Sequence, residues 1–188
     1  MKINIKSIKN SKNHYILFLI MFVIICLFYS QIYPYRLWRM EEDNFFVITS
    51  DFTKTILTSP AGLAEWLGLW LAQWYGNVIV GILIHSIMLL LLGVISFFTF
   101  KENKLEGGLL SIAALPVAAT IGASFYGHSP VMIVSQIVLW SALLIYSKIK
   151  SSSLRLLIFA ILLPILFFLM PGGLLLLLYT IVAIRDLT

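Results

Sequence analysis

Apolar segments of helical length alternate with short polar stretches along most of the chain. A membrane-spanning helix needs about 17–25 mainly apolar residues. Six segments fit or approach this length, the last of them short: residues 14–33, 77–100, 107–125, 130–147, 154–170 and 172–184. The pattern predicts an all-α protein, a single polytopic transmembrane bundle of about six spans over residues 1–188, with a basic tail at 1–13.

The Lys and Arg residues predict the orientation of this bundle, because bases near spanning helices are retained on the cytoplasmic side. With the N-terminus inside, ten of the 13 Lys and Arg residues lie in cytoplasmic segments, and three lie outside: Arg36, Arg39 and Lys54. We therefore expect a cytoplasmic N-terminus and an outer loop at 34–76. The closing letters "RDLT" favour a fragment or a truncated family member.

The composition agrees with a membrane protein. Hydrophobic residues make up 61% of the chain and the mean hydropathy is +1.00, which exceeds what a water-soluble domain carries. The net charge of +5 comes from bases beside apolar segments, and this indicates orientation in a lipid bilayer rather than binding of nucleic acid. The single cysteine, Cys26, lies within an apolar segment, so no disulfide framework and no thiol metal site is expected.

The second half of the outer loop, "SPAGLAEWLGLWLAQWYG", predicts a helix over residues 60–75, with Ser59 as N-cap and Pro60 at the first position. One face of this helix carries an indole every four residues: Trp66, Trp70 and Trp74. Its length of about 24 Å falls short of the roughly 30 Å hydrocarbon core. We expect the helix to lie in the outer membrane interface. Packing of the indoles on neighbouring spans, or an early start of the second span, is the alternative.

Three consecutive acids, Glu41, Glu42 and Asp43, open the outer loop and are the candidate catalytic residues. Neighbouring carboxylates such as Glu41 and Glu42 can bind a divalent cation, Mg²⁺ or Mn²⁺, that neutralises a phosphate leaving group. Alternatively, one carboxylate accepts a proton from an attacking hydroxyl. Four other polar residues on the outer side are candidates for substrate binding: Arg36, Arg39, Asp51 and His128. Acids that are merely solvated are the structural alternative.

This order of elements resembles the beginning of the GT-C superfamily of polytopic glycosyltransferases, with a first span followed by an outer loop that opens with acids and continues into a membrane-parallel helix. The resemblance covers mainly residues 1–100. It implies a polyprenyl-phosphate-linked sugar as donor, and it places the role of base or metal ligand on an acid of the triplet. The chain departs from the superfamily in having about six spans and no soluble C-terminal domain.

The loop sequence "EEDNFFVITSDFTKTILTSPAGLAEWLGLWLAQWYGN" also resembles uncharacterised multi-span inner-membrane proteins of Bacteroidota, which implies a bacterial inner-membrane location. The leading hypothesis is the N-terminal part of a GT-C-like glycosyltransferase that acts on lipid-linked sugar at the outer face. The second hypothesis is a non-enzymatic scaffold or assembly subunit that contacts other membrane subunits. A transporter comes third, because polar residues within the spans are few.

Overall fold

A computed structural model describes residues 5–32, 34–102, 109–124 and 130–187, and this part of the chain is helical without any strand. Six helices are long and mainly apolar: α1 (Ile5–Leu27), α5 (Val78–Glu102), α6 (Leu109–Ser124), α7 (Pro130–Lys148), α8 (Ser152–Leu169) and α9 (Gly172–Leu187). A π-helix, η1 (Phe28–Ile32), extends α1. The all-α prediction is confirmed for the described residues.

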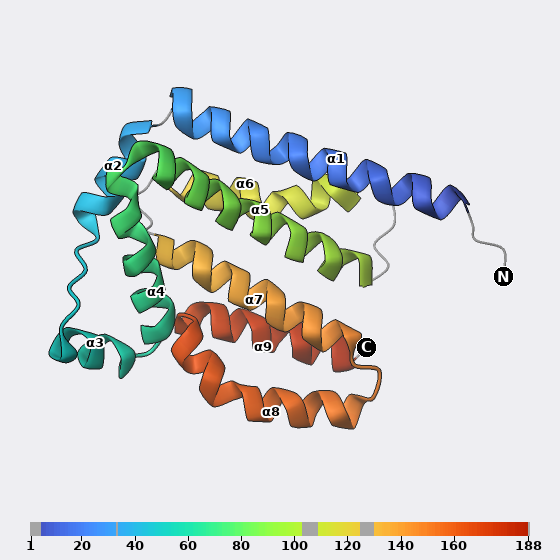
Figure 1. The fold of residues 1–188 in the computed structure, drawn as a ribbon. Helices are drawn as coiled ribbons and strands as arrows, with labels where there is room; N and C mark the ends of the chain where they lie inside the picture. Colours follow the sequence, from blue (N-terminus) through green and yellow to red (C-terminus); the bar gives the residue numbers. More distant parts are fainter. Residues whose placement is uncertain (1–4, 33, 103–108, 125–129, 188) are drawn as a thin grey trace.

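The long helices run side by side, and the short helices between α1 and α5 lie together at one end of them (Figure 1). We call this the loop end, made of α2 (Pro34–Asp43), α3 (Ser50–Leu57), α4 (Gly62–Ala72) and the 3-10 helix η2 (Gln73–Gly76). In Figure 1, α4 crosses the direction of the long helices. α1 begins and α9 ends at the end opposite to the loop end.

Four of the helices are long and apolar enough to cross a membrane, and they mark the chain as a membrane protein: His14–Gln31, Val78–Glu102, Pro130–Lys148 and Ser152–Leu169. α6 and α9 have 16 residues each, below that length. Their crossing of the bilayer, the total of about six spans and the orientation therefore stay predictions.

The segment at 34–76 contains more helix than the sequence predicted, because α2 and α3 precede the expected helix. Ser59 is not the N-cap of α4, and that prediction is wrong: its hydroxyl donates to the Ile56 carbonyl at 2.7 Å and so ends α3. The chain then turns at Ala61, whose φ of 61° is left-handed and whose N–H donates to the Phe167 carbonyl at 2.9 Å. The α4 helix consequently begins at Gly62, not at Pro60.

Two buried apolar clusters hold the bundle together. The first joins the loop end to α1, α5, α6 and α7, and it contains Tyr29, Leu37, Tyr75 and Leu89. The second joins α7, α8 and α9. The first cluster fixes α2 and η2 on the long apolar helices, so the acid-bearing segment has a defined position.

Close backbone packing fixes α4 on the start of α7. A Cβ added to Gly68 of α4 would lie 2.5 Å from the backbone nitrogen of Val131, so only glycine allows this approach. Pro130 occupies the first position of α7, where its missing N–H costs no helical hydrogen bond. The loop end is therefore packed directly on the bundle.

Candidate functional site

The α2 helix divides into an inner and an outer face. Arg36, Leu37 and Met40 are buried against the bundle, with Arg36 only 7% exposed. Tyr35 and Trp38 are exposed on the other side. The amphipathic spacing i, i+1, i+4 of the buried residues explains why this charged segment forms a helix on the bundle surface.

Side-chain hydrogen bonds tie the end of α2 to η2. The Asn44 amide donates to the Met40 carbonyl at 2.6 Å, and the Gln73 amide donates to the Asn44 carbonyl at 2.8 Å. The Asn44 N–H also donates to the Glu41 carbonyl at 3.2 Å. These bonds fix the backbone at Glu41 relative to η2.

Glu41 is the one acid of the triplet that turns toward the bundle. It is half-buried, and a Cβ added to Gly76 would lie 3.8 Å from its Cδ, so the carboxylate lies over Gly76 at the end of η2. Within the part of the chain that the structure describes, its carboxylate oxygens form no hydrogen bond and no ion pair. Glu41 thus belongs to a helix end whose backbone is held at η2, and its carboxylate lies over Gly76.

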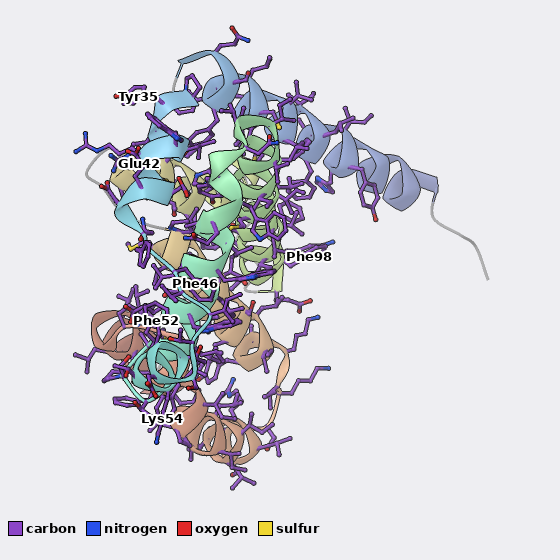
Figure 2. All side chains as sticks on the ribbon, turned by 60° about the vertical axis from the view of Figure 1, so that its left-hand side comes forward. Tyr35, Glu42, Phe46, Phe52, Lys54 and Phe98 are labelled. Carbon is purple, nitrogen blue, oxygen red and sulfur yellow. The ribbon has the colours of Figure 1, made fainter. Side chains whose placement is uncertain are left out.

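Glu42 and Asp43 are exposed. The Arg39 Nε lies 3.6 Å from Asp43 Oδ2 with both side chains more than half exposed, a pair worth only about 0–1 kcal/mol. Figure 2 shows Glu42 and Tyr35 on α2, at the end of the bundle opposite to Phe98 of α5.

The two predicted metal ligands, Glu41 and Glu42, differ in exposure. Consecutive residues on a helix point about 100° apart, and Glu41 is half-buried whereas Glu42 is exposed. Among the described residues, no three His, Cys, Asp or Glu side chains come together in a way that would hold a metal ion. A cation at this place would therefore take Glu41 as its ligand from the triplet, and the site stays a prediction.

Of the other predicted substrate-binding residues, the structure describes Asp51 and Arg36. Asp51 is exposed in the first turn of α3, which packs on α4. Arg36 is on the same helix as Glu41 but faces the bundle. His128 lies outside the described residues.

The three tryptophans do not form a single stack. The Trp66 ring packs edge-on against Phe46 at 5.6 Å between centroids, and Phe46 in turn contacts Phe52 at 5.7 Å (Figure 2). Trp70 and Trp74 contact each other at 6.2 Å and are 39% and 50% exposed. Trp66 therefore packs within the loop end. Trp70 and Trp74 are the exposed members of the three, and the membrane-interface role stays a prediction.

A buried polar pair under the loop end was not predicted as a unit. The Tyr75 hydroxyl lies 2.9 Å from His85 Nδ1, and the Tyr29 ring packs on the His85 ring at 4.5 Å between centroids. Burial, with Tyr29 adding to it, raises the pKa of the Tyr75 phenol, so this group stays protonated. His85 is thus a packed and hydrogen-bonded histidine within α5.

The sequence also matches a known family over almost all of its length. The model of DUF6057, described as a family of unknown function, matches residues 9–188. The chain belongs to DUF6057. No curated protein and no solved structure matches it.

In this DUF6057 chain the loop end presents one carboxylate whose backbone and neighbours are fixed. Such a carboxylate can accept a proton from a hydroxyl, or it can bind a divalent cation together with phosphate oxygens and water. Both uses require a substrate that reaches the end of the spanning helices. The exposed Trp70 and Trp74 side chains are of the type that lies at a headgroup boundary.

Proposed function

We propose that this chain is part of a GT-C-like glycosyltransferase that uses a polyprenyl-phosphate-linked sugar at the outer face of the bacterial inner membrane, with Glu41 as its essential carboxylate. The observation that carries the proposal is the placement of Glu41 over Gly76, half-buried and unpaired within the described residues. A carboxylate that served only solubility would be expected to point to solvent, as Glu42 and Asp43 do.

The charge distribution supports an outward-facing loop end. The C-terminal ends of α5 and α7 lie at the end of the bundle opposite to α2 (Figure 1), and they carry Lys101 and Lys148. Bases beside spanning helices favour the cytoplasmic side. Glu41 would then meet lipid-linked substrates that are presented in the outer leaflet.

Two chemical roles fit this position. As a general base, Glu41 would take the proton of the acceptor hydroxyl as it attacks the sugar carbon that carries the phosphate. As a cation ligand, it would place Mg²⁺ or Mn²⁺ on the departing polyprenyl phosphate. Arg39, exposed on the same helix, is available to the phosphate oxygens because its contact with Asp43 is weak.

Binding of polyprenyl phosphate tests the proposal without knowledge of the sugar or the acceptor. The protein in nanodiscs with Mg²⁺ is expected to bind polyprenyl phosphate saturably, and about tenfold or more tightly than the uncharged polyprenol, because the loop end recognises the phosphate. Equal binding of the two lipids would contradict the proposal. It would favour the alternative, a non-enzymatic scaffold or assembly subunit.

A further inference from the structure

Positive charge gathers at the turn between α7 and α8, at the end of the bundle opposite to the loop end (Figure 1). Lys148 is the last residue of α7, Lys150 lies in the turn, and both side chains are exposed. Arg155 follows in the first turn of α8 and is half-buried. We call these three residues the basic turn. No Asp or Glu occurs between Glu106 and Asp186, so the sequence on both sides of the basic turn supplies bases without an acid.

The position of Arg155 is fixed by an aromatic ring. Its guanidinium lies over the Tyr146 ring of α7, 5.1 Å from the ring centroid. Tyr146 is buried, and its hydroxyl donates to the Val182 carbonyl of α9 at 3.4 Å, so the ring is itself held between helices. A guanidinium has five N–H donors in a planar fork, and this fork matches two oxygens of a phosphate. Arg155 is therefore pre-organised for a phosphate at the basic turn.

The depth of the basic turn indicates which phosphate it meets. The helices on either side of it, Pro130–Lys148 and Ser152–Leu169, are both long and apolar enough to cross a membrane. The turn between two such helices lies at the level of the lipid headgroups. Ile145 before the turn and Leu154 after it are exposed apolar side chains, 49% and 48% accessible. A phospholipid can place its phosphate at the bases and its acyl chains on this apolar surface, whereas a soluble anion meets the bases alone.

The charge of the basic turn favours a lipid with a net negative headgroup. A zwitterionic headgroup carries its own cation, which Lys148 and Lys150 would repel, whereas an anionic headgroup such as that of phosphatidylglycerol has none. Each base beside an anionic lipid surface strengthens binding about fivefold. We infer that the basic turn is a binding site for an anionic phospholipid, whose phosphate is held by Lys148, Lys150 and Arg155. This site is independent of Glu41 and of the proposed function.

Native mass spectrometry of the full chain, released from detergent micelles, measures the affinity for single lipids. The probes are dioleoyl phosphatidylglycerol and dioleoyl phosphatidylcholine, which have the same acyl chains and differ in headgroup charge. The wild-type protein is expected to bind phosphatidylglycerol at least about tenfold more tightly than phosphatidylcholine. Inorganic phosphate at the concentration of the lipid should not displace phosphatidylglycerol, because it makes no contact with the apolar surface.

Lys148→Gln combined with Lys150→Gln is expected to lower the affinity for phosphatidylglycerol about tenfold or more and to leave that for phosphatidylcholine unchanged. Both side chains are exposed, so the variant should fold as the wild type does. Lys54→Gln combined with Lys101→Gln is the matched control, with the same loss of two exposed positive charges. Lys54 lies at the loop end and Lys101 stands next to the exposed Glu102, so the control should change the affinity by no more than about twofold.

Three results would overturn the assignment of an anionic-phospholipid site. Equal affinity of the wild-type protein for the two lipids would show that the headgroup charge is not recognised. Equal loss in the two double variants would show attraction by net charge without a site at the basic turn. Displacement of phosphatidylglycerol by inorganic phosphate would show a site for a soluble anion instead of a lipid.

Discussion

Glu41→Gln is expected to lower the release of polyprenyl phosphate from a polyprenyl-phosphate sugar by about 100-fold or more, the usual effect of removing a general base. The substitution keeps the size of the side chain and removes its charge. The Gln variant should fold as the wild type does, because an amide of the same size fits the half-buried position over Gly76. Loss of the charge also removes a ligand for Mg²⁺, so the prediction holds for both chemical roles.

Glu42→Gln is the matched control, because it makes the same chemical change at the next residue of the same helix. Glu42 is exposed, so its loss should change the release by no more than about twofold. Release is measured in nanodiscs with a panel of hexose and pentose donors and with water as acceptor. Equal loss in both variants, or loss in Glu42→Gln alone, would show that the inward position of Glu41 is not what matters.

Gly68→Ala is expected to destabilise the protein by about 1–3 kcal/mol, the cost of an extra methyl group where there is no space. The added Cβ would meet the backbone of Val131 at 2.5 and 2.6 Å, and backbone cannot rotate away as a flexible side chain can. The α4 helix would have to move off α7, and Trp70 and Trp74 would move with it. The free energy of unfolding in mixed detergent and SDS micelles measures this effect.

Gly122→Ala is the same substitution in another helix, and it is expected to change the stability in the opposite direction. Nothing lies within 4 Å of a Cβ added at Gly122 of α6. Alanine should therefore stabilise by about 0.5–1 kcal/mol through its better helix propensity. Equal changes in the free energy of unfolding of both variants would contradict the close packing of α4 on α7.

The long helices could be predicted from the sequence because their apolar character persists for whole turns. The second span was expected at 77–100, and α5 runs from Val78 to Glu102. The span expected at 130–147 corresponds to α7 at Pro130–Lys148. Local signals agree with two helix starts: Pro130 stands at the first position of α7, and the Ser151 hydroxyl caps α8 by accepting from the Leu154 N–H at 3.5 Å. Lengths alone could not decide whether α6 and α9 cross the bilayer.

The loop end was harder to predict because its helices are short and tertiary packing decides where each of them lies on the bundle. α2 has ten residues, half of them charged, and its burial of Arg36 has no signal in the local sequence. The turn at Ala61 depends on a bond to the Phe167 carbonyl, more than a hundred residues away, so Ser59 looked like the start of α4. Short-range patterns contain no information about such contacts.

The candidate site was predicted in residue type but not in geometry. The sequence put Glu41, Glu42 and Asp43 together, and only the rotation of α2 separates Glu41 from its neighbours. The hydrogen bond between Tyr75 and His85 spans the break between η2 and α5, so helical spacing did not pair them. A single histidine within an apolar span was the available signal, since burial of such a residue is costly without a partner.

Labelling of one engineered thiol tests the central claim, that the loop end with Glu41 faces outward. The exposed Glu42 is replaced by cysteine in a Cys26→Ser background, so that position 42 carries the only thiol. A membrane-impermeant maleimide added to intact spheroplasts is predicted to label this thiol fully, and labelling should not increase after lysis. Labelling that occurs only after lysis would place α2 on the cytoplasmic side and would contradict both the orientation and the proposed transfer of sugar from a donor in the outer leaflet.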